Sequence, residues 1–216
     1  MRTKSVYISI GILMLVGIIF EINFWKGAML QKKETPPLNQ ILPIALAPEV
    51  EIILQRKIAL IGDLIKNPAI IEEVKKANET NASLTQEQIN KLDAVWINSP
   101  SKATFFQPFF TNNAAKKLIE FQELNLGFSE IFITDARGLN VAITNKTTDY
   151  YQADEDWWIK SYNQGAGIVW HGDIEFDQSA QTEGISLYVP IKDPTNGATI
   201  GIVKGVLTLT AIKFEL

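Results

Sequence analysis

The chain has 216 residues and a formal net charge of −4. This length suits one folded domain, alone or with a membrane anchor. The acidic balance argues against nucleic acid as a partner, because phosphate binding requires a basic face and no basic cluster here exceeds two lysines. The absence of cysteine excludes disulfides, thiolate zinc sites and iron–sulfur clusters.

An apolar run near the amino terminus predicts a transmembrane helix. Residues 6–20 carry no charge, and residues 21–25 extend the stretch to about 20 residues, or roughly 30 Å of helix. Arg2 and Lys4 precede the run, which favours a cytoplasmic amino terminus. We therefore predict a single-pass signal anchor over residues 1–25, with residues 6–25 in contact with membrane lipid. A cleaved signal peptide is the main alternative, but no A-x-A-like cleavage site follows closely.

Residues 26–47 are predicted to form a tether, because prolines interrupt any regular element there. Apolar residues then recur at three- and four-residue steps and predict an amphipathic helix over residues 48–66, which Pro68 interrupts and a second piece continues to Asn78. Residues 48–78 would pack on the domain's own sheet, and they are also the predicted surface for a homodimer or a membrane-protein partner.

Two further helices are predicted before the first strand. Thr85 and Gln88 form a capping-box pattern that opens a helix to about residue 97. Residues 98–110 are expected to be a loop whose four phenylalanines fill a core or an interface rather than a ligand box. A third helix is expected over residues 112–125.

From residue 129 onward, alternation and turn residues predict an antiparallel sheet. Strands are expected from Ser129, over 139–145, 167–176 and 185–191, and over 199–212, with the last four residues frayed. Asp135 to Gly138 and Asp193 to Gly197 are the predicted turns. Helices followed by a meander of strands indicate an α+β domain.

The segment from Asp149 to Glu183 concentrates carboxylates and aromatic rings, with eight acidic residues against one lysine. This composition suits either an apolar pocket with a few oriented carboxylates or an aromatic core with a solvated acidic rim. Asp173 and Asp177 should share one face of a strand, with Glu175 expected on the other. His171 with these aspartates is thin evidence for a metal site, and we predict no metal and no cofactor. Asp149 is either a ligand contact or a cap of the segment that begins at Tyr150.

These residues resemble the Cache family of extracytoplasmic PAS-like sensor domains, also called PDC domains. The resemblance rests on I-T-D-A-R-G-L-N-V-A at 133–142, T-D-Y-Y-Q-A-D-E-D-W-W at 148–158, Gly172-Asp173, Asp177 and Y-V-P-I at 188–191. It covers about residues 48–212 and implies a five-stranded antiparallel PAS-like sheet backed by a long N-terminal helix. Residues 48–127 would then form the helical part and residues 128–212 the sheet. Members of the family bind small molecules between the sheet and its covering loops.

The resemblance also implies site residues. Trp157 and Trp158 match an aromatic pair that walls the pocket of amino-acid-binding members, and Asp177 matches an aspartate that holds a ligand ammonium. Glu155 stands where those members have an arginine for the ligand carboxylate, so an amine is a better ligand here than an anion. The candidate ligand-binding residues are Asp149, Tyr151, Trp157, Trp158, Asp173, Asp177 and Tyr188.

The sequence contains no nucleophile–base constellation and no phosphate-binding loop, so we predict that the protein is not an enzyme. We expect a small-molecule-sensing module on the periplasmic or extracellular side of a bacterial cytoplasmic membrane. No transmitter segment follows the last strand, so a signal would pass through a partner chain. The alternative is a structural or accessory subunit of a membrane complex that uses the same fold as a docking surface without ligand.

Overall fold

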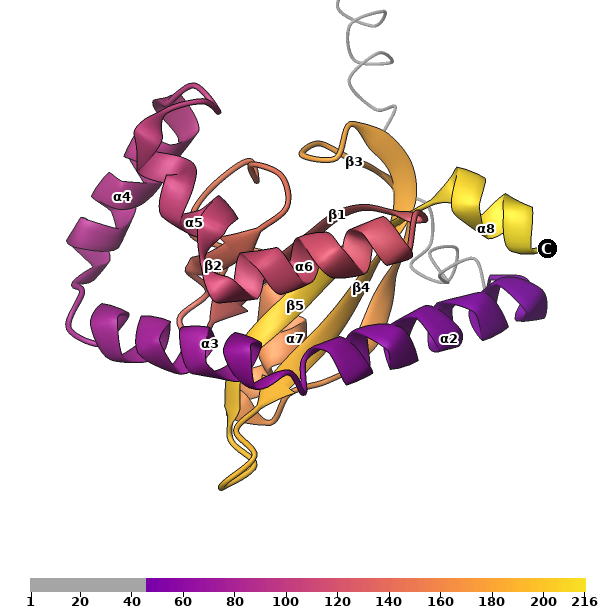
Figure 1. The fold of residues 1–216 in the computed structure, drawn as a ribbon, viewed down its shortest axis with the longest axis horizontal. Helices are drawn as coiled ribbons and strands as arrows, with labels where there is room; N and C mark the ends of the chain where they lie inside the picture. The colour runs from indigo at the N-terminus through magenta and orange to yellow at the C-terminus, as the bar shows by residue number, and fades with distance from the viewer. Residues whose placement is uncertain (1–45) are drawn as a thin grey trace, which may run out of the picture. The chain divides into compact units, whose positions relative to one another are not determined.

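The computed structural model describes residues 46–216 of the chain (Figure 1). The predicted membrane anchor at residues 1–25 and nearly all of the predicted tether lie outside the described residues. Within residues 46–216, no helix combines the length and the apolar character that a bilayer span requires.

The centre of the domain is a five-stranded antiparallel sheet in the order β2-β1-β5-β4-β3, which confirms the predicted α+β, PAS-like architecture. The strands are β1 (Phe128–Asp135), β2 (Asn140–Ile143), β3 (Trp170–Asp177), β4 (Thr182–Lys192) and β5 (Thr199–Thr208). Because β5 lies between β1 and β4, the last strand joins the two hairpins into one sheet.

The long N-terminal helix is present in two pieces, α2 (Pro48–Leu64) and α3 (Pro68–Asn81). Asn67 caps α3 by accepting a hydrogen bond from the Ala69 amide, which ends one helix and begins the next. With α6 (Asn113–Leu124), these helices cover one face of the sheet (Figure 1). Their apolar residues and those of β1, β4 and β5 form the larger core cluster, including Leu54, Ile61, Ile131, Leu187 and Val203.

A second core lies around Trp96 of α4 (Gln86–Asn98), whose capping box at Thr85 forms as predicted. The predicted loop 98–110 is partly helical, with η2 (Thr104–Phe106) and α5 (Gln107–Thr111), because Pro108 falls in the first turn of α5, where proline is tolerated. Its phenylalanines pack around Trp96, with Phe106 at 4.8 Å and Phe109 at 5.1 Å between ring centroids. The prediction that they fill a core is confirmed.

The other face of the sheet carries α7 (Asp156–Tyr162), followed by η3 (Asn163–Gly165).

The prediction for the carboxyl end of the chain was wrong. The last strand ends at Thr208, whose side chain caps a helix, α8 (Leu209–Glu215), in place of further strand and a frayed end. Apolar residues continue past Thr208, so composition alone could not mark this change, but a threonine ahead of an apolar stretch is an N-cap signal.

Candidate ligand-binding pocket

A pocket of about 820 Å³ opens on the face of the sheet that carries α7. It lies between β3, β4 and β5, the loop that precedes α7, and the β3–β4 turn. The pocket is lined by Thr148, Asp149, Gln152, Asp154, Glu155, Asp156, Trp157, Trp170, Gly172, Asp173, Glu175, Phe176, Asp177, Gln178, Ser179, Tyr188 and Lys204. Its volume lies in the range of small-molecule sites.

One cross-strand row of the sheet contributes Lys204, Tyr188 and Trp170 to the lining of the pocket. The register places Phe132 of β1 opposite Lys204, Lys204 opposite Tyr188, and Tyr188 opposite Trp170. Tyr188 stacks on Trp170 with 4.4 Å between ring centroids and on Trp157 of α7 with 5.1 Å. Three stacked rings from two strands and a helix therefore make a rigid aromatic wall.

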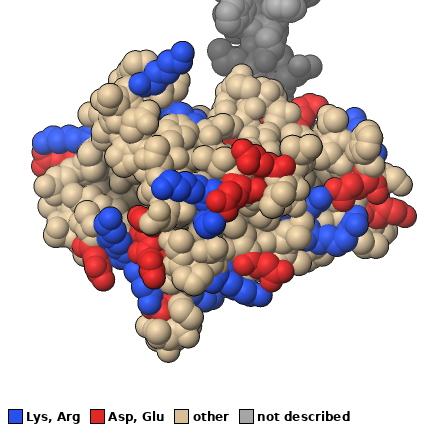
Figure 2. All heavy atoms as spheres, viewed as in Figure 1, with Lys and Arg blue, Asp and Glu red and all other residues tan. Residues whose placement is uncertain are grey.

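Carboxylates dominate the charge of the lining. Seven of the lining residues are acidic, namely Asp149, Asp154, Glu155, Asp156, Asp173, Glu175 and Asp177, and Lys204 is the one lysine or arginine among them. On the face shown in Figure 2, by contrast, basic and acidic side chains are interspersed. The pocket thus carries a local negative charge that the net charge of −4 does not reveal.

The loop that carries Asp149 is held in place by its own polar groups. The Asn140 amide and the Thr147 hydroxyl both donate to the Asp149 carbonyl oxygen, at 2.9 Å and 2.6 Å. Asp93 of α4 accepts hydrogen bonds from the backbone amides of Tyr150 and Tyr151. This bracing fixes the carboxyl group of Asp149 at the pocket wall.

The Asp149 carboxyl group lies in a negative environment. Burial and, to a smaller extent, the neighbouring charges of Glu155, Asp93 and Asp154 together raise the pKa of its carboxyl group to about 6, against the hydrogen bond from Gln152. A positive group placed here would relieve this repulsion. Asp149 does not cap α7, whose N-cap residue is Glu155, so the capping alternative does not hold.

The carboxylate of Asp177, in contrast, already accepts hydrogen bonds from the β3–β4 turn and from Lys204. Its Oδ1 atom accepts hydrogen bonds from the Ser179 amide, the Ser179 hydroxyl and the Ala180 amide, at 2.8 to 3.0 Å. Its Oδ2 atom accepts one from Lys204 Nζ at 2.9 Å. Burial acts to raise the pKa of Asp177, but Lys204 and the hydrogen bonds outweigh it and hold the pKa below its usual value.

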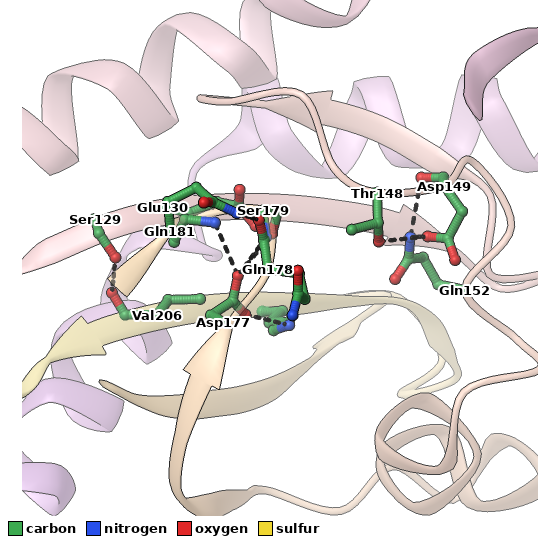
Figure 3. A network of polar contacts seen from close by, with 12 residues as sticks. Ser129, Glu130, Thr148, Asp149, Gln152, Asp177, Gln178, Ser179, Gln181 and Val206 are labelled. Carbon is green, nitrogen blue, oxygen red and sulfur yellow. Dashed lines mark hydrogen bonds and ion pairs between the residues drawn. The ribbon is translucent and has the colours of Figure 1, made fainter. Parts of the chain in front are cut away.

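Glu130 of β1 shares the Ser179 hydroxyl with Asp177 and was not among the candidate residues. Figure 3 shows Glu130, Ser179 and Asp177 together, with Asp149, Thr148 and Gln152 at the other side of the view. Glu130 is fully buried, its Oε1 atom is 2.8 Å from the Ser179 hydroxyl, and its Oε2 atom has no hydrogen-bond partner among the described residues. Burial raises the pKa of Glu130 to about 7, with a smaller contribution from the charge of Asp177.

Five of the candidate residues meet at this pocket: Asp149, Trp157, Asp173, Asp177 and Tyr188. The other two lie elsewhere. Trp158 is buried, donates from Nε1 to the Thr134 hydroxyl at 3.0 Å and stacks on Tyr162. Tyr151 is partly buried against the second core cluster.

Glu175 and His171 of β3 do not lie where the sequence predicted. Glu175 lines the same pocket as Asp173 and Asp177, so its expected place on the opposite face was wrong; residues two apart on a strand share a face. His171 points to the helical layer, where its Nε2 atom is 3.0 Å from Glu51 of α2. Within residues 46–216, no group of three or more potential ligand side chains could hold a metal ion.

Sequence reasoning missed Lys204, Trp170 and Glu130. Lys204 had a signal, because it is a single charge inside the otherwise apolar β5. Charged side chains within such a strand are costly to bury and need a partner. Glu130 had only the weaker signal of a carboxylate on a strand that proves to be buried on both faces.

No known protein-family model matches the chain, and no curated protein does. Among solved structures, the chain is similar to the ligand-binding domain of the Pseudomonas fluorescens chemoreceptor CtaA in complex with L-valine, with 18% identity over 78% of this chain and 58% of that one and a TM-score of 0.46. It is also similar to the E. coli DcuS sensor domain, with 15% identity over 60% of this chain and 92% of that one and a TM-score of 0.37. The sensory domain of the Campylobacter jejuni chemoreceptor Tlp3 with isoleucine bound has 15% identity, a TM-score of 0.39, and coverage of 79% of this chain and 67% of that one.

These similar structures are sensor domains of the Cache class, the family that the sequence resembles. The chain spans less than two thirds of the CtaA domain. The PAS-like architecture of this protein rests on its own strands and helices and not on these likenesses.

Proposed function

We propose that this domain binds a small organic cation, an amine, in the pocket over β3, β4 and β5. The observation that supports this ligand class is the imbalance of charge in the lining, seven carboxylates against one lysine that is already paired. Ammonium groups are attracted both to carboxylates and to the faces of tryptophan and tyrosine. An anionic ligand would meet repulsion from the carboxylates, and the one lysine or arginine among the lining residues, Lys204, is already paired with Asp177.

An amino acid is a weaker candidate than an amine. Its ammonium group could use the same carboxylates, but its carboxylate would need a basic partner. Glu155 stands at the pocket edge, where an arginine would have been required, and Lys204 is bound to Asp177. Among molecules of equal size, removal of the carboxylate should therefore improve binding.

The proposed cellular role is that of an extracytoplasmic sensing module, with the described domain outside a bacterial cytoplasmic membrane and residues 6–25 as its anchor. The apolar run and the basic residues before it support this topology. Two reporter enzymes fused after residue 216 test the topology, one that is active only in the periplasm and one that is active only in the cytoplasm. The periplasmic reporter should be active, and activity of the cytoplasmic reporter instead would refute the topology.

A thermal-shift screen of amines, matched amino acids and matched carboxylates tests the ligand class. A ligand at 100 times its Kd adds about 2.7 kcal/mol to the free energy of unfolding. For a domain of this size that corresponds to a rise in Tm of roughly 5 to 10 °C. Stabilisation by carboxylates and not by amines would refute the assignment, and the absence of any shift would favour the second candidate.

The second candidate is a docking subunit without ligand. One observation favours it: β3 is an edge strand of the sheet, and its Ile174 and Phe176 side chains are 53% and 51% exposed. Apolar side chains beside an unpaired strand edge are typical of strand-addition interfaces. In this case replacement of both residues by serine should abolish co-purification of the partner chain and leave the fold intact.

A further inference from the structure

The Asp177 carboxylate is occupied by donors of the protein itself and is shielded from a ligand. An ionised carboxylate offers about four acceptor positions. Four donors occupy Asp177, three on Oδ1 from the β3–β4 turn and one on Oδ2 from Lys204. Only 7% of its side-chain surface is exposed. A ligand ammonium could reach this carboxylate only by displacing Lys204.

Lys204 therefore takes the place of a ligand cation at one end of the pocket. Its Nζ atom lies 2.9 Å from Asp177 and 5.7 Å from the ring centroids of Phe132 and Trp157. These rings and the strand hold the ammonium group in position, and its side chain is only 14% exposed. A second ammonium here would meet the like charge of Lys204, and the buried Asp177 carboxylate would offer it no free position.

The other end of the pocket carries carboxylates without a basic partner among the described residues. Within residues 46–216, no lysine or arginine forms an ion pair with Asp149, Asp154 or Glu155. Asp149 is the most enclosed of the three, and both neighbours add to its negative environment. The Trp157 ring, next in line to Asp156 on α7, borders the same space.

We propose that the Lys204–Asp177 ion pair makes the pocket selective for ligands with a single ammonium group, which binds at the Asp149–Glu155 end. This inference rests on the proposed function, because it locates the cation within the same site. Lys204 is then a specificity-determining residue, since it occupies Asp177, the one buried carboxylate of the lining, whereas Asp173 and Glu175 on the same strand are exposed. The body of the ligand extends along the wall formed by Trp157 and Tyr188.

Calorimetric titration with butylamine and with 1,4-diaminobutane tests this assignment, because the two probes differ by one ammonium group. The protein should bind the diamine no more than about twofold tighter, the statistical advantage of two equivalent ends. In Lys204→Met, where Asp177 becomes available, the preference for the diamine should rise to about tenfold or more. A diamine preference above tenfold in the unaltered protein, or none in the variant, would overturn the proposal.

Asp149→Asn supplies a second test that leaves the ion pair intact, so it remains decisive if Lys204→Met does not fold. It should weaken binding of both amines by about tenfold, whereas Glu123→Gln, which removes one exposed carboxylate from α6, should change neither by more than about twofold. Unchanged butylamine affinity in Asp149→Asn would place the cation elsewhere and overturn the inference. If neither amine binds the unaltered protein, the proposed function fails, and the inference fails with it.

Discussion

Replacement of Glu130 by glutamine should stabilise the protein at neutral and alkaline pH. The Glu130 side chain is fully buried, and its Oε2 atom lacks a hydrogen-bond partner among the described residues. The Ser179 hydroxyl lies 2.8 Å from both Glu130 and Asp177, but its single hydrogen cannot be donated to both carboxylates. A protonated Glu130 resolves the conflict, because it donates to Ser179 while Ser179 donates to Asp177. Glutamine reproduces that donor without a charge.

The magnitude follows from the pKa of Glu130, which burial raises from its usual 4.5 to about 7. Below pH 4.5 the carboxyl group is protonated in the folded and the unfolded protein, and it contributes no pH dependence. Between pH 4.5 and 7 the unfolded chain releases the proton while the folded protein keeps it, so the free energy of unfolding falls as pH rises. A shift of about 2.5 pH units corresponds to about 3 kcal/mol lost by pH 8.

Urea unfolding at pH 4.5 and pH 8 measures this effect. Glu130→Gln should match the unaltered protein at pH 4.5 and exceed its free energy of unfolding by about 3 kcal/mol at pH 8. Glu123→Gln, an exposed substitution of the same chemistry, should change neither value by more than about 0.5 kcal/mol. An equal stability difference at the two pH values would show that Glu130 does not titrate between them, and the reasoning would be refuted.

Two further predictions concern the second core and the pocket. Trp96 is fully buried and donates from Nε1 to the Thr147 carbonyl oxygen, so Trp96→Ala should lower the free energy of unfolding by about 3 to 5 kcal/mol in a urea titration. The control, Val95→Ala at a half-exposed neighbour, should lower it by under about 1 kcal/mol. A loss of similar size in the two variants would argue against the assignment of Trp96 to a core. The affinity for amines should fall as the pH drops through about 6, because the pKa of Asp149 is raised to about 6 and its protonation removes a negative charge from the pocket. Titration calorimetry at pH 5 should therefore give up to about tenfold weaker binding than at pH 7.5. A flat affinity profile between those pH values would remove Asp149 from the binding site.

The sequence by itself determined the order and type of most elements. Helical periodicity marked α2 and α3, the capping box marked α4, and the two glycine-ended turns marked the β1–β2 and β4–β5 hairpins, because these signals depend on residues close together in the chain. The boundaries that it missed, at α5 and α8, are short helices in stretches that also read as loop or strand. Trp157 and the acidic character of the pocket were likewise visible in one contiguous segment, residues 149–183.

Only the tertiary structure decided which of those residues act together. Lys204 lies 27 residues beyond Asp177, and only the β4–β5 pairing, which sets Lys204 beside Tyr188, brings the two within 2.9 Å. Glu130 and Ser179 are 49 residues apart in the sequence, yet their side chains lie 2.8 Å apart. A periodic pattern can show that a side chain is buried, but it cannot show which distant charge it meets. That pairing makes Asp177, the expected ligand contact, an internal counter-ion. Asp149 is then the most enclosed of the lining carboxylates that have no basic partner among the described residues.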